Sequence, residues 1–257
     1  MSSIRIIGPG RAGTSFAEAL RRTGHEVDGP LARRDDVSAA ADGVDAVILA
    51  VPDDEIAIVA ANVVPHSSCV VLHLSGSLLL DVLAPHERRA SMHPLVPLPT
   101  ADIGAARLLE GVTIAVAGDA LAASLAASLG ARVVEVADED RAAYHAAACI
   151  AANHVVALLG QVERVASTVG LDVAAFLGLA RAAIDDVETL GPRGALTGPA
   201  SRGDWSTIVR HLDALAPAER AAYGACVALA LELAAPGQSV APPLDVLERV
   251  TAADVAH

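Results

Sequence analysis

The sequence predicts an α/β domain with a doubly wound parallel sheet, followed by an all-α domain. From residue 3 to about residue 137, short and almost wholly apolar runs alternate with helical segments. This continuous hydrophobicity is typical of parallel strands that helices cover on both faces. After residue 138 the strand-like runs end, and the helical segments that follow are separated by Gly and Pro. We therefore expect two domains, residues 1–138 and 139–257.

The first domain contains five clear strand patterns and one weaker pattern. The clear ones span residues 3–7, 45–51, 69–74, 111–117 and 132–137. Residues 24–34 are the weaker candidate, because Gly29 and Pro30 interrupt them. Helices are expected at 12–24, which ends at Gly24, and at 54–64, which has an acidic first turn. This alternation of strands and helices predicts the doubly wound sheet.

The second domain contains only helical patterns. They span residues 139–169, 172–190, 204–215, 217–235 and 242–251. Asp138 and Asp204 are the expected N-caps of the first and third of these helices. The longest apolar run, residues 221–235, is too short to cross a bilayer and contains Glu232. It is typical of a buried or subunit-interface helix.

Composition excludes several classes of function. The 257 residues carry a formal net charge of −13, which makes nucleic acid and membrane surfaces poor partners. All basic residues are Arg, so a lysine acid, Schiff base or phosphate-binding lysine is excluded. The three cysteines have no CxxC spacing, which indicates free thiols in a reducing cytoplasm and no metal site. No secretion signal is visible, so we expect a cytoplasmic protein.

The segment IRIIGPGRAGTSF contains a GxGxxG motif directly between a predicted strand and a predicted helix. Gly8 permits the tight turn, Gly10 permits close approach of a pyrophosphate, and Gly13 permits close helix–strand packing. The alternative is a glycine-rich turn without a ligand. In this context a dinucleotide site is favoured, and the residues expected to contact it are Gly8, Pro9, Gly10, Arg11, Ala12, Gly13, Val51 and Pro52.

The arginines after the second strand favour NADP over NAD. NAD-binding folds usually place an acidic residue about 20 residues beyond the glycine loop. Arg33 and Arg34 stand there in this chain, and guanidinium groups suit a 2′-phosphate. The alternative is a solvated arginine pair that opposes Asp35 and Asp36. Asp53 is interpreted as a helix cap.

With these residues in view, the chain resembles Rossmann-like proteins whose helical C-terminal half is the domain of unknown function 2520. More distantly it resembles ketopantoate reductase, pyrroline-5-carboxylate reductase and the 6-phosphogluconate and 3-hydroxyisobutyrate dehydrogenases. The matching segments are GPGRAGTSFAEAL, AVPDDEI, HLSGS, MHPL, YHAAACIAAN and LTGPASRGD. The resemblance implies an NADP-dependent oxidoreductase, with a helical substrate domain that also forms a homodimer.

The resemblance also identifies candidate catalytic residues. In ketopantoate reductase-like proteins the long helix carries a Lys and two Asn at four-residue spacing, and His145, Cys149 and Asn153 occupy those positions here. Asn153 matches, whereas His145 replaces the lysine and would donate a proton near neutral pH. The alternative is a hydrogen-bonded core histidine, with Cys149 as plain packing.

Further candidates follow the ends of strands and the loops. Ser75 in HLSGS is expected to hold a substrate oxygen, whereas His73 is expected to be structural. His93 would line the same cleft or belong to a turn. In the loop of residues 191–204, Arg202 could clamp a carboxylate, with Arg193 as a weaker candidate, or it could be a surface arginine.

These observations predict an NADP(H)-dependent oxidoreductase that reduces the C=O or C=N bond of a small carboxylate. A ketopantoate-like 2-oxo acid is the first substrate expected, and a cyclic imine is the second. The proposed catalytic residues are His145, Asn153, Ser75 and Arg202. The alternative is an NADP(H)-binding sensor or assembly protein without turnover, which the absence of lysine favours.

Overall fold

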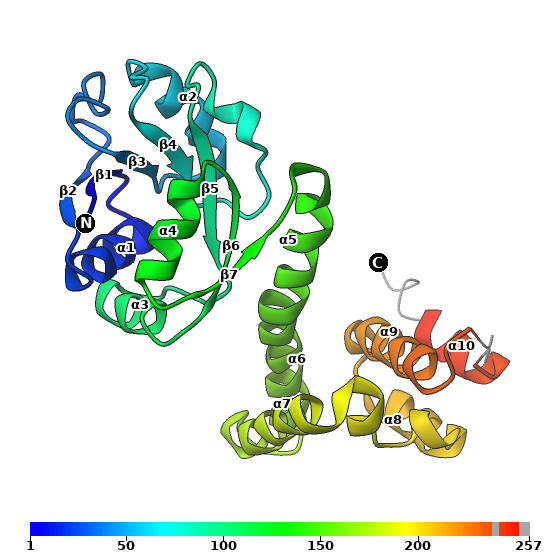
Figure 1. The fold of residues 1–257 in the computed structure, drawn as a ribbon. Coiled ribbons are helices and arrows are strands. Elements are labelled where there is room, and N and C mark those ends of the chain that lie inside the picture. The colour runs from blue at the N-terminus through cyan, green and yellow to red at the C-terminus, as the bar shows by residue number, and fades with distance from the viewer. Residues whose placement is uncertain (238–241, 252–257) are drawn as a thin grey trace. The chain divides into compact units, whose positions relative to one another are not determined.

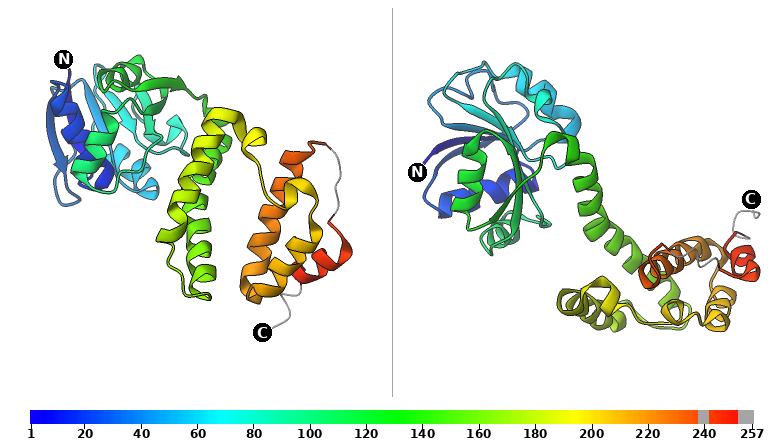
Figure 2. Two further views of the ribbon diagram at one scale, coloured as in Figure 1. Left: turned by 90° about the horizontal axis from the view of Figure 1, so that it is seen from below. Right: turned by 45° about the vertical axis from the view of Figure 1, so that its right-hand side comes forward.

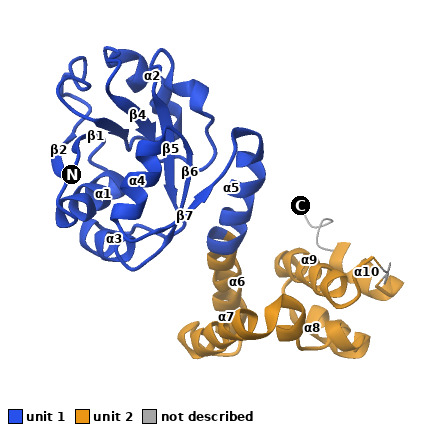
Figure 3. Ribbon diagram, viewed as in Figure 1, with its two compact units in different colours: residues 1–153 blue, residues 154–257 orange. Residues whose placement is uncertain are grey.

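The computed structural model describes residues 1–237 and 242–251, which form two compact units (Figure 3). The first unit spans residues 1–153 and is an α/β fold. The second unit spans residues 154–257, and its described residues form helices. The predicted fold class is therefore confirmed. The position that we expected for the domain boundary, residue 138, lies where the long helical segment begins, and the first compact unit extends beyond it.

The sheet has seven strands in the order β2-β1-β3-β4-β5-β6-β7. All neighbouring strands are parallel except β5 and β6. The chain runs from β1 to the edge strand β2 and then crosses to β3, so the strand order reverses beside β1. The strands are β1 (Ser3–Ile7), β2 (Glu26–Leu31), β3 (Ala46–Leu49), β4 (Val70–His73), β5 (Arg89–Pro94), β6 (Thr113–Gly118) and β7 (Arg132–Glu135).

Strand β2 continues through Gly29 and Pro30, so the expected interruption was wrong. Proline is tolerated here because β2 lies at the edge of the sheet and needs fewer ladder hydrogen bonds. The pairing of β1 with β2 shifts register between Arg5 and Ile7, opposite this part of the strand.

Helices cover both faces of the sheet (Figures 1 and 2). The helices α1 (Arg11–Arg22), α3 (Ala101–Leu108) and α4 (Ala120–Ser128) bury one apolar cluster, and α2 (Asp53–Asn62) buries the other. In β1, Ile4 and Ile6 point to the first cluster and Ile7 to the second, as strand alternation requires. With few aromatic residues available, both clusters consist mainly of Ala, Val, Leu and Ile.

The segment Asp138–Ser167 forms one long helical stretch. It comprises the short 3-10 turn η2 (Asp138–Asp140), α5 (Arg141–Cys149), the π turn η3 (Ile150–His154) and α6 (Val155–Ser167). By length and composition alone this stretch could cross a membrane, so our expectation that residues 221–235 are the longest apolar run was wrong. Asp138 also does not cap the helix. It accepts hydrogen bonds from the Leu80 backbone and from Arg141.

The second unit contains α7 (Ala174–Ala195), α8 (Trp205–Ala214), α9 (Pro217–Ala234) and α10 (Leu244–Thr251). The range of α7 is divided at Gly191, whose backbone is not helical (φ 71°, ψ 165°), so the first of its two helical parts ends at residue 190 as expected. Asp204 caps α8, as predicted, by accepting a hydrogen bond from the Thr207 amide. The core of this unit consists of Ile208, Leu212, Val227, Leu231 and Val246.

His73 is the most unusual residue in the interior of the sheet. It lies at the end of β4 with no exposed surface, and neither of its ring nitrogens has a hydrogen-bond partner within the described residues. Burial, reinforced by the positive charge of Arg141, lowers the pKa of His73 to about 4. The imidazole is therefore neutral in the folded protein at pH 7, as expected for a structural histidine.

The neutral state of His73 predicts a loss of stability in acid. Because the pKa is 6.5 when unfolded and about 4 when folded, the unfolded state takes up the proton first as pH falls. Stability is complete above pH 6.5 and decreases toward pH 4. In His73→Leu, the loss of unfolding free energy between pH 7 and pH 4.5 should be smaller by about 2–3 kcal/mol. Urea unfolding at both pH values measures this, and an equal loss in both proteins would contradict it.

Candidate active site

The glycine turn joins β1 to α1 as predicted. Gly8 has a φ of +110°, and a Cβ on it would overlap the Ala50 carbonyl oxygen. A Cβ on Gly13 would overlap the Gly8 carbonyl oxygen, so the first turn of α1 packs directly on the loop. Gly10 is the N-cap of α1 and faces open space, because a Cβ on it would have no neighbouring atom within 4 Å. The free amides of the helix N-terminus can therefore meet an anion above Gly10.

Two cavities adjoin the glycine turn. The first has a volume of about 590 Å³ and the second about 630 Å³, which is the usual size range of ligand pockets. They share Gly10 and the residues Ala50, Val51 and Pro52, which follow β3. This shared wall lies beyond the carboxyl ends of β1 and β3, where the strand order reverses. The layout can accommodate the two halves of a dinucleotide.

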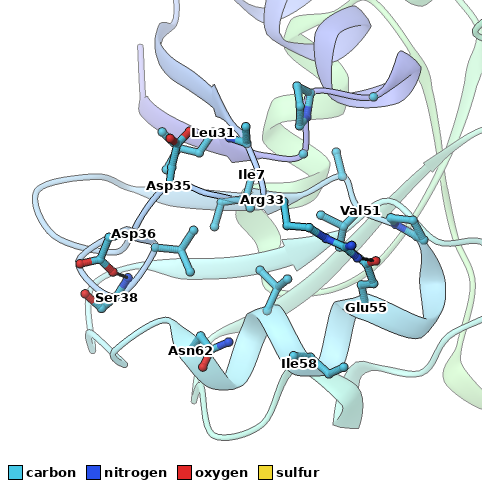
Figure 4. Close-up of a pocket in the computed structure, with 18 residues that line it drawn as sticks. Ile7, Leu31, Arg33, Asp35, Asp36, Ser38, Val51, Glu55, Ile58 and Asn62 are labelled. Carbon is cyan, nitrogen blue, oxygen red and sulfur yellow. Dashed lines mark hydrogen bonds and ion pairs between the residues drawn. The ribbon is translucent and has the colours of Figure 1, made fainter.

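The first cavity is lined by the ends of β1 and β2 and by α2 (Figure 4). Arg33 lines it and forms an ion pair with Glu55 of α2. Asp35 and Asp36 also line it, and both accept hydrogen bonds from nearby backbone amides instead of pairing with the arginines. Arg34 is exposed and does not line the cavity. Of the two arginines, only Arg33 is thus placed to meet a ligand there.

Most of the residues that line the second cavity have apolar side chains, but a few polar groups face it. Its polar side chains are Arg11 of α1, His93 at the end of β5 and Asn153 of the π turn. The remaining lining residues are Gly10, Ala12, Ala50, Val51, Pro52, Leu74, Pro94, Val96, Pro97, Leu98 and Pro99. Of the residues expected to bind the cofactor, Arg11 and Ala12 lie only here, whereas Gly8 and Pro9 lie only in the first cavity.

The residues around His93 determine its hydrogen bonding and its charge. Its Nδ1 lies 2.7 Å from the Tyr144 hydroxyl oxygen, and its ring meets the tyrosine ring edge to face. Burial, and then the charges of His145 and Arg141, lower the pKa of His93 to about 4. At neutral pH the imidazole is therefore uncharged and carries one proton. It can donate one hydrogen bond, which is the role of an electrophile for an oxygen.

His145 lies behind His93 and does not line the cavity. The two rings are 5.7 Å apart. The Nδ1 of His145 is buried without a hydrogen-bond partner among the described residues, and its Nε2 is 3.5 Å from the Cys149 sulfur. A Cβ on Gly76 would lie 2.5 Å from that Nδ1 and 2.9 Å from His93 Nε2. The Gly76 backbone therefore packs closely against both imidazoles.

The π turn separates Asn153 from His145. In a regular helix, residues 145, 149 and 153 would share one face. His145 and Cys149 do so within α5, but Asn153 lies in the π turn, where the extra residue per turn changes the helical phase. Asn153 reaches the cavity, and His145 does not.

Ser75 belongs to a hydrogen-bonded group with Asp53. Its hydroxyl donates to Asp53 over 2.7 Å, and its oxygen accepts from the amides of Ser77 and Leu78. Ser77 also donates to Asp53. Asp53 makes no capping hydrogen bond in α2, so the interpretation of Asp53 as a cap was wrong. The hydroxyl proton of Ser75 is used within the protein, and Ser75 does not line either cavity.

Arg141 is the largest fully buried side chain among the described residues. Its guanidinium donates to Ser91 of β5, to the Ser75 carbonyl oxygen over 3.3 Å, and to Asp138 over 3.2 Å. A buried cation needs such partners. These bonds join the start of α5 to the segment after β4 and to the middle of β5, near the contact between Tyr144 and His93.

Arg202 lies in the second unit, at the end of a 3-10 turn (Ala200–Arg202). Arg193 is in α7 and donates to the Ala234 carbonyl oxygen over 3.3 Å. Their expected contact with a substrate carboxylate stays a prediction.

The comparison with protein families gives one match. The family described as "Domain of unknown function (DUF2520)" matches residues 109–229. The match covers less than half of the 257 residues. This DUF2520 segment starts just before β6, includes the last two strands, and ends within α9. No curated protein matches the sequence.

Solved structures align with the DUF2520 segment and the rest of the chain. A Bacteroides fragilis protein, provisionally named an NADP oxidoreductase, covers 90% of this chain and 98% of its own at 21% identity, with a TM-score of 0.73. A Thermotoga maritima protein has the same coverage at 24% identity and a TM-score of 0.67. Plasmodium falciparum pyrroline carboxylate reductase, solved with NADP bound, covers 91% and 98% at 12% identity and a TM-score of 0.59. These identities show a common fold alone.

Sequence reasoning missed two polar residues close to His93 and misassigned a third. Tyr144 and Arg141 act through contacts between α5 and β5, which no local pattern reveals. Asp53 was recognised but given the wrong role. For Arg141, a signal was present: it begins an otherwise apolar helix, and a charge in that position suggests a specific partner.

Two substitutions in the glycine turn should separate folding from anion binding. Gly13→Ala overlaps the Gly8 carbonyl oxygen, so it should lower the melting temperature by several degrees. Gly10→Ala meets no protein atom and should keep the wild-type melting temperature, yet it should weaken NADPH binding at least about tenfold. Thermal melts and NADPH titration measure the two effects. Wild-type NADPH affinity in Gly10→Ala would show that no pyrophosphate approaches this residue.

Proposed function

We propose that this protein is an NADP(H)-dependent oxidoreductase that reduces the C=O or C=N bond of a small carboxylate. The observation that carries this proposal is the pair of cavities that share the glycine turn, one next to Arg33 and the other next to His93. The first suits an adenosine half and the second a nicotinamide half. Relatives of the same fold that are named as NADP oxidoreductases support the proposal.

The residues present fit a dinucleotide. The space above Gly10 can accept a pyrophosphate at the N-terminus of α1. Arg33 can bind a 2′-phosphate if its guanidinium leaves Glu55 or binds both groups. Val51 and Pro52 form the wall between the cavities. When bound, the nicotinamide supplies the hydride.

The proposed acid is His93, in place of His145. His93 faces the second cavity, whereas His145 lies behind it. A neutral imidazole N–H and the Asn153 amide can both donate to a carbonyl oxygen as negative charge develops there. This donor set favours a C=O bond, and a ketopantoate-like 2-oxo acid stays the first substrate proposed. A cyclic imine is the second.

Recognition of the substrate carboxylate is proposed for arginine. Arg11 is the one charged side chain that lines the second cavity in the described part of the chain. It can meet either the cofactor pyrophosphate or the substrate carboxylate. Arg202 in the helical unit is the other candidate. Ser75 gains no support from its geometry, because its hydroxyl donates to Asp53.

The homodimer that we expect through the helical unit is also a proposal. Several large apolar side chains of α6 and α7 are exposed, among them Val156, Leu179, Ile184 and Leu190. A second copy of the chain could cover such a surface. Sedimentation equilibrium of the whole protein tests this, and a monomer at micromolar concentration would contradict it.

The second candidate function is an NADP(H)-binding sensor without turnover. The lack of lysine and the position of His145 behind the cavity favour it. Purified protein mixed with NADPH and a panel of 2-oxo acids and cyclic imines distinguishes the two functions. Loss of absorbance at the nicotinamide wavelength supports the enzyme. Tight NADPH binding without consumption across the panel supports the sensor.

The arginine pair provides a test of cofactor choice. Arg33 lines the first cavity and Arg34 does not, although the two are adjacent in the chain. Arg33→Ser should raise the Kd for NADPH about tenfold or more and leave the Kd for NADH unchanged, because a charge-assisted contact to the 2′-phosphate is lost. Arg34→Ser should change neither Kd by more than about twofold. Equal effects of both substitutions would contradict a specific phosphate site at Arg33.

The two histidines provide a test of the acid. His93→Ala should lower kcat at least about a hundredfold with the best substrate of the panel, because it removes the donor in the cavity. His145→Ala should lower kcat much less, since His145 contacts His93 but not the cavity. NADPH affinity should be unchanged in both. A larger loss of kcat in His145→Ala than in His93→Ala would instead identify His145 as the acid.

A further inference from the structure

The pair formed by Tyr144 and His93 has a defined geometry. The hydroxyl oxygen of Tyr144 lies 2.7 Å from His93 Nδ1, with ring centroids 5.6 Å apart and ring planes at 88°. Tyr144 is half-buried in α5, three residues after the buried Arg141. The opposite ring nitrogen of His93, Nε2, lies beside the Gly76 backbone, and His93 lines the second cavity. The tyrosine therefore contacts the ring nitrogen opposite the one that would donate to a substrate.

One direction of this hydrogen bond satisfies both residues. If Tyr144 donates to Nδ1, its hydroxyl proton has an acceptor and the proton of the imidazole is on Nε2. If Nδ1 donates instead, the hydroxyl proton has no other acceptor within the described residues. The first arrangement is favoured, because it gives the hydroxyl proton of the half-buried Tyr144 an acceptor within the protein. His93 then presents Nε2–H as a donor.

Because His93 is uncharged, it carries one ring proton, and the nitrogen that holds this proton determines whether Nε2 can donate a hydrogen bond. The groups that act on His93 are Arg141 and His145 from α5 and Asp53 from α2. Burial lowers the pKa of His93 most, and His145 and Arg141 lower it further, so His93 is uncharged at neutral pH. A neutral imidazole has only one N–H, and a proton on Nδ1 would leave Nε2 as an acceptor, which would repel a carbonyl oxygen.

We propose that Tyr144 is a positioning residue that keeps the proton of His93 on Nε2 and replaces that proton during reduction. This inference rests on the proposed oxidoreductase function. As the hydride reaches the carbonyl carbon, the substrate oxygen forms an O–H bond with the proton of Nε2. Nδ1 takes the hydroxyl proton of Tyr144 at the same time, so the imidazole stays neutral and Tyr144 becomes a phenolate. After the product leaves, solvent gives a proton to Nε2 and the proton on Nδ1 returns to the phenolate, which restores the starting state.

Two observations support the phenolate step. Arg141 lowers the pKa of Tyr144, although burial raises it by more. The phenol is therefore protonated at rest, and a fixed positive charge lies near the oxygen that becomes negative. His93 lines the second cavity, so solvent can return a proton to its ring once the product leaves.

The chain contains its own control for this pair. Tyr223 and His211 are a second tyrosine–histidine pair, with an oxygen–Nδ1 distance of 2.7 Å, a centroid distance of 5.8 Å and a ring angle of 85°. Both lie in the helical unit, and neither lines the two cavities. Tyr223→Phe therefore removes the same type of hydrogen bond without a change at His93.

The first experiment measures the tautomer directly. In protein with ¹⁵N-labelled histidine at pH 7, the shifts of the His93 ring nitrogens should identify Nε2 as protonated, with the signals assigned through their loss in His93→Gln. In Tyr144→Phe they should move toward a mixture of both tautomers, whereas Tyr223→Phe should retain the wild-type shifts. A proton on Nδ1 in the wild type, or unchanged shifts in Tyr144→Phe, would overturn the proposal. Thermal melts confirm that the variants fold.

The second experiment measures the rate. With the best carbonyl substrate, Tyr144→Phe should lower kcat about tenfold or more and change KM less than about twofold, because only the reacting state needs the second proton. Tyr223→Phe should retain wild-type kcat. An unchanged kcat in Tyr144→Phe would contradict the relay. If no substrate is reduced by the wild type, the proposed function fails, whereas the tautomer measurement still decides the role of Tyr144.

Discussion

The close approach of the glycine turn to the end of β3 is the constraint on which the site depends. Gly8 lies against the Ala50 carbonyl group, and Gly13 lies against the Gly8 carbonyl group, with no room for a Cβ at either position. This packing places the N-terminus of α1 at the reversal of strand order. Both cavities adjoin that point and share Gly10, so a single backbone contact determines where an anion and both halves of a dinucleotide can bind.

A second constraint is the buried guanidinium of Arg141. A charge without solvent is costly unless hydrogen bonds compensate it, and Arg141 obtains them from Ser91, from the Ser75 backbone and from Asp138. The start of α5 is thereby fixed against the segment after β4 and the middle of β5. The same cation also lowers the pKa of His93. Arg141 therefore both holds α5 on the sheet and helps to keep a residue of the second cavity uncharged.

The fold and the glycine turn could be predicted because local rules determine them. Strand hydrophobicity and the backbone needs of Gly8, Gly10 and Gly13 act within short segments. The proposed acid, His93, could not be predicted in the same way. Helical periodicity grouped His145 with Asn153, but the π turn changes the phase between them. His93 becomes prominent only through its contact with Tyr144, and that contact joins two elements distant in sequence.

The most direct test of the account is a crystal structure of the protein with NADPH. The account predicts the pyrophosphate on the amides above Gly10, the adenosine phosphate beside Arg33, and the nicotinamide in the second cavity with its reactive carbon facing His93. A nicotinamide outside that cavity, or one turned away from His93, would contradict the central claim that one glycine turn serves both cavities for hydride transfer.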